Sequence, residues 1–212
     1  MTGEAEQKVL DGTVWDEFCD SLKEAGKIIR SDKAPQDAFN QAEGYRYLSR
    51  LLRGGLEGFL EFRDPLFPQL RCGAHETIKL GADNPDNRYE SATINPAYEY
   101  RIHGTRGTVD YLGISTVINK YASGGTIEVT GHIDHKEMAI GPNGEIDIII
   151  SSAEKSGNWL PMEPDTSTLH VRQTFGDHDT ETLADLRLER VDGQGAPSPL
   201  TPERVDEGLT MA

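Results

Sequence analysis

Two runs decide the fold of this chain: Asp83-Asn-Pro-Asp-Asn-Arg-Tyr89, and Tyr98-Glu-Tyr-Arg-Ile-His-Gly-Thr-Arg-Gly-Thr-Val-Asp-Tyr-Leu-Gly-Ile-Ser115. The first run is a polar corner whose backbone is restricted by Pro85. The second run alternates at a period of two residues on both sides of Gly104-Thr105-Arg106-Gly107, as strands do. The sequence therefore predicts a turn that leads into a β-hairpin.

The chain before these runs predicts helices. Apolar side chains recur at three- and four-residue spacing from Trp15 to Ile29 and again from Phe39 to Leu60. We expect a helical segment over residues 13–63, preceded by a flexible arm over residues 1–12, where no such period exists. The pair Gly54-Gly55 predicts either a bend or break in the second helix or the close approach of another backbone, and we favour the bend or break.

The chain after these runs predicts further strands. Short alternating segments separated by turn residues continue to about residue 191, and an edge strand is expected over Ala74–Leu80. This spacing is typical of antiparallel sandwiches and barrels. The fold class is therefore α+β, with N-terminal helices followed by an antiparallel β-sandwich or jelly-roll-like barrel over residues 64–192. Residues 193–212 are expected to form a linker and the start of a C-terminal helix.

The composition argues against two classes of partner. The chain of 212 residues has 36 acidic and 21 basic side chains, for a formal net charge of −15. We therefore expect neither nucleic acid nor a membrane as a partner, because phosphate-rich surfaces attract the opposite charge. No export signal is visible at the N-terminus, and Cys19 and Cys72 are expected to be two reduced thiols. The predicted localisation is cytoplasmic.

Several separated motifs resemble one bacterial family. The motifs are Asn84–Tyr89, Tyr100–Thr108, Gly157–Leu160, Val171–Phe175 and Leu188–Arg190. In this order they resemble bacterial proteins with the DUF1214 domain, which is often paired with a DUF1254 domain. The resemblance covers most of residues 10–212 and implies a β-sandwich, but no activity, because the family has none established. Its members are longer, so we expect this chain to correspond to the N-terminal half of a longer family member.

The candidate catalytic residues are His132, Asp134 and Arg101. On a strand, His132 and Asp134 project to the same face, and His135 projects to the other face. A metal ion would need a further ligand from a distant position such as His103. We favour the alternative, a solvated strand end with charged side chains, and expect neither a metal nor a cofactor.

The candidate ligand-binding residues are Arg88, Tyr89, Tyr100 and Trp159. Arg88 carries a planar guanidinium suited to a carboxylate, and Trp159 could stack on a ring. Each also has a structural interpretation, in which Arg88 fastens the polar corner to the sheet and Trp159 covers the core.

Two functions are compatible with these features. The first is the binding or transformation of a small polar or aromatic molecule at the mouth of the sandwich. The alternative is a non-catalytic structural or assembly module that docks a second copy, a partner chain or a second β-rich half. An uncovered apolar face would indicate the alternative, with the candidates Leu48, Leu51, Leu52, Leu56 and Phe59. No nucleophile motif decides whether the protein is an enzyme.

Overall fold

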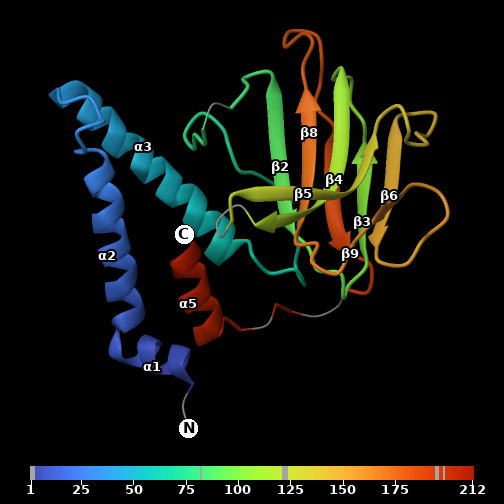
Figure 1. Ribbon diagram of the computed structural model, residues 1–212. Coiled ribbons are helices and arrows are strands. Elements are labelled where there is room, and N and C mark those ends of the chain that lie inside the picture. The colour runs from blue at the N-terminus through green and yellow to red at the C-terminus, as the bar shows by residue number, and fades with distance from the viewer. Residues whose placement is uncertain (1–2, 82, 121–123, 194–195, 198) are drawn as a thin grey trace. The chain divides into compact units, whose positions relative to one another are not determined.

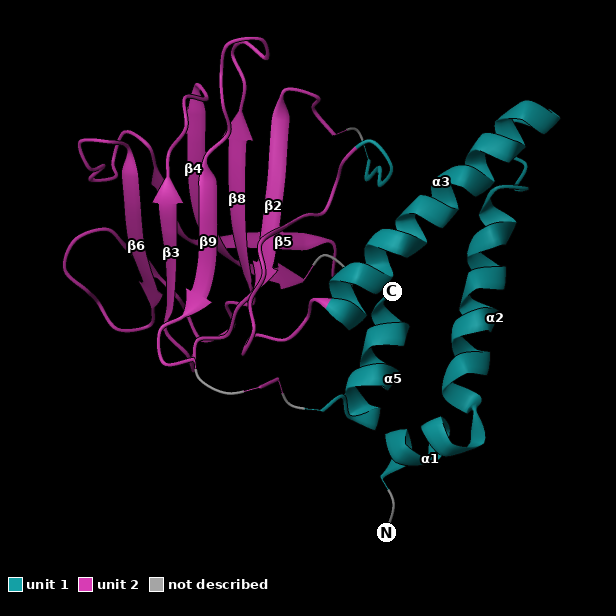
Figure 2. Ribbon diagram, turned by 180° about the vertical axis from the view of Figure 1, so that it is seen from behind, with its two compact units in different colours: residues 1–61, 76–82, 198–212 teal, residues 62–75, 83–197 magenta. Residues whose placement is uncertain are grey.

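The chain forms two compact units. A computed structural model describes residues 3–81, 83–120, 124–193, 196–197 and 199–212. Unit 1 is helical and comprises residues 1–61, 76–82 and 198–212, and unit 2 contains the strands and comprises residues 62–75 and 83–197 (Figure 2). The structure therefore confirms the α+β class.

Unit 2 is built from two sheets (Figure 1). A five-stranded sheet has the order β1-β2-β8-β4-β5, and a four-stranded sheet has the order β7-β6-β3-β9. Described neighbours are antiparallel except β6 and β7, which are parallel. The strands are β1 (Arg71–Cys72), β2 (Asn87–Thr93), β3 (Tyr100–Thr105), β4 (Tyr111–Lys120), β5 (Thr126–Asp134), β6 (Glu145–Ser151), β7 (Trp159–Pro161), β8 (Thr168–Thr174) and β9 (Asp185–Arg190).

The inner faces of the two sheets form the core of unit 2. Alternate residues of β3 and β6 in one sheet, and of β4 and β8 in the other, are almost completely inaccessible to solvent. Because side chains on a strand alternate between its faces, this burial leaves the intervening residues on the two outer faces. The buried set is Tyr100, Ile102, Leu112, Ile114, Ile146, Ile148, Ile150, Leu169 and Val171.

The predicted hairpin around Gly104–Gly107 is wrong. β3 pairs with β6 and β9, whereas β4 pairs with β5 and β8, so the two strands belong to different sheets. The segment between them is a corner where the chain crosses from one sheet to the other. Gly104 has a φ of 151° and Gly107 a φ of 64°, and a Cβ at Gly104 would collide with the backbone carbonyl oxygen of Asp185. The two glycines serve this close crossing rather than a two-strand turn.

Two smaller strand predictions also need correction. Ala74–Leu80 does not form an edge strand, because a turn at Glu76 and Thr77 leaves only isolated bridges at His75 and Ile78. The edge position is taken instead by β1. Strand β2 was expected only as a polar corner, although Asn87 to Thr93 pair along their whole length with β8.

Unit 1 has a small core made by helices α2 and α5. The helices are α1 (Glu4–Asp11), α2 (Thr13–Ile28), α3 (Ala38–Leu56), the π-helix η1 (Glu57–Glu61) and α5 (Pro202–Met211). Val14, Phe18 and Leu209 are its buried hydrophobic cluster. The Thr201 hydroxyl accepts a hydrogen bond from the Arg204 N–H at 3.3 Å, which confirms the predicted start of the C-terminal helix.

The expectation of a flexible arm is wrong for residues 4–11, which form α1. Lys8 Nζ lies 2.9 Å from a Glu17 carboxylate oxygen and 3.4 Å from one of Asp206, so ion pairs attach α1 to α2 and α5. No residue of α1 is buried. Its large apolar residues, Val9 and Leu10, are both exposed, so the helix adds nothing to the buried cluster of unit 1.

The predicted break at Gly54-Gly55 does not occur. Helix α3 continues through both glycines to Leu56, and η1 follows it directly. A Cβ at Gly55 would lie 2.5 Å from the Ala212 carbonyl oxygen. The glycine therefore permits the close approach of another backbone, which was the less favoured alternative.

The sheet crossing makes a testable prediction about Gly104. Gly104→Ala should lower the free energy of unfolding by about 2–4 kcal/mol, because it combines a strained φ with a backbone collision. Gly144→Ala is the matched control: its φ is 85°, but a Cβ there meets nothing within 4 Å, so its loss should be about 1 kcal/mol. Urea unfolding of both variants measures the difference, and equal losses would contradict the close crossing at Gly104.

Candidate functional site

The outer face of the five-stranded sheet carries the densest group of polar and aromatic side chains that we find in unit 2. In one row across the sheet, Ser91 of β2 pairs with His170 of β8, which pairs with Ser115 of β4, which pairs with His132 of β5. In the next row, Tyr89 pairs with Arg172, Arg172 with Gly113, and Gly113 with Asp134. We call six residues of this face the outer-face cluster: Tyr89, Tyr111, Ser115, His132, His170 and Arg172.

Ser115 and His132 form a direct pair. The Ser115 hydroxyl oxygen lies 2.8 Å from His132 Nδ1, and the two share a hydrogen bond. Because neighbouring strands β4 and β5 hold them directly opposite each other, the contact is fixed by backbone pairing. A hydroxyl on an imidazole can exchange a proton with it, so the pair can either orient or deprotonate a bound group.

Tyr111 completes the imidazole's contacts. Its hydroxyl oxygen lies 3.4 Å from His132 Nε2, and its ring meets that of His135 edge-on with centroids 5.8 Å apart. A Cβ at Gly113 would lie 2.7 Å from Tyr111 Cζ. The ring therefore lies across Gly113, and the missing side chain there is what lets Tyr111 reach His132.

Arg172 is the exposed cation of the cluster. Its guanidinium carbon lies 5.5 Å from the centroid of the Tyr89 ring, a cation–π contact. Within the described part of the chain the guanidinium has no ion pair or hydrogen bond. Beside it, Asn87 Nδ2 donates to the Tyr89 hydroxyl at 2.6 Å, while the buried Asn87 Oδ1 has no described partner. A fork of donors that no described residue uses therefore lies over Tyr89.

Burial sets the protonation of the cluster. It lowers the pKa of His170, and the charge of Arg172 lowers that pKa further. Burial also raises the pKa of Tyr111, helped by the charge of Asp134. His170 and Tyr111 are therefore both neutral at pH 7, and Arg172 supplies the positive charge of the cluster.

Asp134 shares this face, but its carboxylate belongs to the following turn. One of its oxygens accepts a hydrogen bond from the Lys136 N–H at 2.7 Å, and this bond lowers the pKa of Asp134. Among the residues that the structure describes, no three His, Cys, Asp or Glu side chains are grouped so that they could hold a metal ion. Asp134 thus lies beside the cluster as a fixed negative charge.

Arg88 and Tyr89 point to opposite faces of β2. Arg88 Nη2 lies 3.3 Å from Glu90 Oε1, and the other Glu90 oxygen accepts from the buried Gln173 amide at 3.1 Å. Gln173 Oε1 in turn accepts from the Ala184 N–H at 2.7 Å. This inner-face network connects the segment before β9 to the sheet through Gln173 and Glu90, and Arg88 joins it at Glu90 of its own strand.

The remaining predicted residues lie elsewhere. Tyr100 is completely buried in the core, where its hydroxyl accepts from the Asn95 N–H at 2.9 Å and donates to the Pro65 carbonyl at 3.0 Å. Burial raises the pKa of Tyr100 to about 12. The structure therefore does not place Tyr100 at a surface site, and the expected lining of Tyr89, Tyr100, Arg88, Arg101 and His132 is not brought together.

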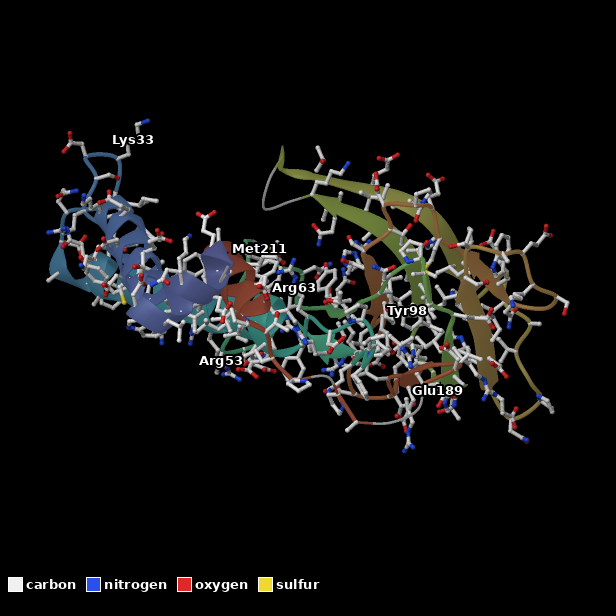
Figure 3. All side chains as sticks on the ribbon, turned by 90° about the horizontal axis from the view of Figure 1, so that it is seen from below. Lys33, Arg53, Arg63, Tyr98, Glu189 and Met211 are labelled. Atoms are coloured by element: carbon white, nitrogen blue, oxygen red, sulfur yellow. The ribbon has the colours of Figure 1, made fainter. Side chains whose placement is uncertain are left out.

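Arg101 lies on the outer face of the four-stranded sheet. It makes two hydrogen bonds with Asp147, at 2.7 and 2.8 Å, and a longer ion pair with Glu189, which Figure 3 labels. Trp159 begins β7, and its indole N–H donates to the Ser151 hydroxyl at 3.1 Å. Arg101 and Trp159 thus take part in cross-strand contacts away from the outer-face cluster.

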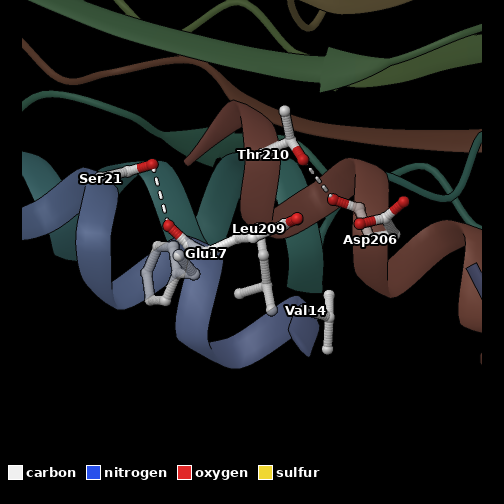
Figure 4. Close-up of a pocket in the computed structure, with 7 residues that line it drawn as sticks. Val14, Glu17, Ser21, Asp206, Leu209 and Thr210 are labelled. Atoms are coloured by element: carbon white, nitrogen blue, oxygen red, sulfur yellow. Dashed lines mark hydrogen bonds between the residues drawn. The ribbon is translucent and has the colours of Figure 1, made fainter. Parts of the chain in front are cut away.

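Unit 1 contains a small pocket between α2 and α5 (Figure 4). Its volume is about 150 Å³, below the roughly 300 Å³ of a typical ligand site. Figure 4 shows Leu209 among its lining side chains, and the Ser21 and Thr210 hydroxyls bond to the carbonyls of Glu17 and Asp206. These hydroxyls are already used within their own helices, so the pocket offers little to a polar ligand.

Sequence reasoning placed Tyr89, His132 and Asp134 among the site residues but missed Ser115 and His170. It did not place Tyr111 or Arg172 there either. The alternation of β4 and β8 was visible, but it does not tell which strands are neighbours. Only the pairing of β8 with β4 and of β4 with β5 places Ser115 between two histidines. The one available signal was the alternation along β8, where His170 and Arg172 alternate with the apolar Leu169 and Val171. This alternation indicates that the two polar side chains share the face opposite to the core.

Comparison with known proteins supports the fold and leaves the activity open. No family model matches the chain, and no curated protein matches it. The chain is 46% identical to an uncharacterized protein from Burkholderia cenocepacia with a crystal structure, at a TM-score of 0.91. The match covers 97% of this chain and 57% of that one, so this chain spans little more than half of its relative's length.

A second solved structure, of a protein from Vibrio parahaemolyticus, is 13% identical with a TM-score of 0.38, a likeness too low to carry an argument. None of the described helices combines the length and the apolar character needed to cross a membrane.

The burial of His170 makes stability depend on pH. Its pKa is lower in the folded state than the ordinary 6.5, so below that pH the unfolded chain binds the proton more readily. Stability should therefore fall as the pH drops from 6.5 towards the folded pKa, and should be unaffected by this group above 6.5. Urea unfolding at pH 7.5 and 5.5 should show a smaller loss in His170→Asn than in the native chain. An equal or larger loss in the variant would contradict a neutral imidazole half-buried on this sheet face.

Proposed function

We propose that unit 2 binds a small polar or aromatic molecule at the outer-face cluster. The observation that carries the proposal is Arg172, a guanidinium held over the Tyr89 ring with no ion pair among the described residues. An arginine whose donors are not used by the protein is available to a ligand. Two tyrosine rings and the Ser115–His132 pair flank it and supply apolar area and hydrogen-bonding groups.

The cluster is held in place before any ligand binds. β4 lies between β8 and β5, so its residues are positioned by ladders on both sides. Side chains fixed on strands lose little freedom on binding. A ligand on an open sheet face buries less area than one in a pocket, so we expect a dissociation constant of roughly 0.1–1 mM for small probes.

The outer-face cluster could transform the bound molecule chemically as well as bind it. His132 touches two hydroxyls, of Ser115 at 2.8 Å and of Tyr111 at 3.4 Å. This arrangement suits the transfer of a proton to or from a group bound beside Arg172. The resemblance to DUF1214 proteins is compatible with either role, because that family has no established activity.

A second candidate function is docking, and one observation favours it. Most of the large hydrophobic side chains that are exposed belong to unit 1, including Trp15 at 58% and Phe39 at 73% exposure. The residues expected to form the uncovered face, Leu48 to Phe59, are instead half-buried. We propose that the exposed residues of α2 and α3 pack against a second copy or a partner chain.

The binding proposal predicts the effect of Gly113→Ala. This change keeps every functional group of the cluster, but its Cβ would displace the Tyr111 ring from His132. We expect the affinity for a bound aromatic probe such as benzoate to fall about tenfold, because orientation is lost while chemistry is kept. Chemical shifts of the Tyr89, Tyr111 and His132 side chains on titration with benzoate, benzyl alcohol, benzamidine and phenyl phosphate measure it.

Two controls make this experiment specific. Gly73→Ala is the matched substitution, because a Cβ at Gly73 meets nothing within 4 Å, and it should leave binding unchanged. Arg88→Ala should lower stability by breaking the Glu90 network but should leave binding unchanged, because Arg88 faces the other way. Absence of shifts at the cluster with all four probes would contradict the binding function.

The docking proposal predicts self-association. At about 100 µM the native chain should scatter light as at least two chains, because exposed aromatic side chains favour association. Trp15→Gln combined with Phe39→Gln should give the mass of one chain. Val191→Gln, which changes an exposed apolar residue of unit 2 (50% exposed), should not alter the mass. A native chain that is monomeric would contradict docking to a second copy.

A further inference from the structure

The charges around Arg172 restrict the kind of molecule that the cluster can hold. The neighbouring His170 is neutral at pH 7, so the guanidinium is the positive group on which an anion would centre. Asp134 and Glu137 lie close enough for their charges to raise the pKa of Tyr111. A doubly charged anion would therefore meet one cation and two nearby carboxylates on a chain of net charge −15.

The shape of the guanidinium favours one class of single anion. Its parallel N–H groups match the two oxygens of a carboxylate. Its central carbon lies 5.5 Å from the centroid of the Tyr89 ring, and none of its N–H groups is bonded to a described residue. A planar carboxylate can thus pair with the guanidinium without breaking a hydrogen bond or ion pair between described residues.

The groups on both sides of Arg172 suit an aromatic body. Tyr89 lies beneath the guanidinium, and the Tyr111 ring covers Gly113, the residue that pairs with Arg172 on the next strand. Aromatic faces separated by one strand can pack against a third ring.

We infer that the molecule bound by the outer-face cluster is an aromatic monocarboxylate, whose carboxylate pairs with Arg172 and whose ring packs between Tyr89 and Tyr111. This inference rests on the proposed binding function and names its ligand class. Ser115 and His132 lie one row further along the sheet, where they can contact a substituent of the ring.

The test compares four probes of one size that differ in charge. Benzoate, benzyl alcohol, benzamidine and phenyl phosphate are titrated into the full chain at pH 7.5, and the side-chain signals of Arg172, Tyr89 and His132 are followed. Benzoate should bind at least about tenfold more tightly than benzyl alcohol or benzamidine, and more tightly than phenyl phosphate. Arg172→Leu should remove the preference for benzoate over benzyl alcohol, and Arg101→Leu on the other sheet should keep it.

Each outcome decides a different point. If no probe shifts the cluster, both the proposed function and this inference are overturned. If benzyl alcohol, benzamidine or phenyl phosphate binds as well as benzoate, the binding function stands and the carboxylate inference is overturned.

Discussion

The burial of the two facing inner surfaces of unit 2 is the constraint on which the rest depends. Fully burying an isoleucine or leucine contributes about 1.5–3 kcal/mol, and the inner faces hold many such residues. Sliding any of these strands by one residue would bring its apolar side chains out of the core and its polar ones in. The register of Ile114 and Val171 in the core therefore also fixes Ser115, His170 and Arg172 on the outside.

The crossing at Gly104–Gly107 converts this constraint into a particular arrangement of side chains. A hairpin would have kept β3 and β4 in one sheet, with β4 as the hydrogen-bonded neighbour of β3, the strand that contains Ile102. Because the chain crosses instead, β4 becomes a central strand between β8 and β5. Only this position puts Ser115 between two histidines and leaves the small Gly113 beside Arg172. The outer-face cluster is thus a consequence of topology as much as of residue choice.

The sequence was sufficient for what depends on local pattern. Alternation identified the segments of β3 and β4 as strands, and Thr201 with Pro202 marked the start of α5, because these signals are contained in a few neighbouring residues. Pairing between strands depends on residues far apart in the chain. Arg88 and Tyr89 were therefore joined in one predicted site, although adjacent positions of a strand face opposite ways. Gly104 and Gly107 gave the same turn signal in the sequence that a hairpin gives. The need for glycine at position 104 comes from the close approach of the Asp185 backbone, which lies about eighty residues later in the chain.

In unit 1, too, local sequence patterns failed to predict contacts between residues far apart in the chain. Lys8, Glu17 and Asp206 attach α1 through charges, which have no period along the chain. This segment was therefore mistaken for an arm, although it contains the apolar residues Val9 and Leu10. The exposure of Trp15 and Phe39 could not be predicted from periodicity either. The apolar pattern of a helix shows which residues share a face, but it does not show whether another element covers them. Unit 1 is held by a small core, and its exposed apolar residues are the feature that a partner would explain.

The placement of β4 is tested most directly by cross-strand nuclear Overhauser effects at Ser115. The account predicts contacts from the backbone protons of Ser115 to those of His132 on one side and His170 on the other, with none to β3. Contacts joining β4 to β3 as a hairpin, with Ser115 far from both histidines, would contradict it and would remove the outer-face cluster with it.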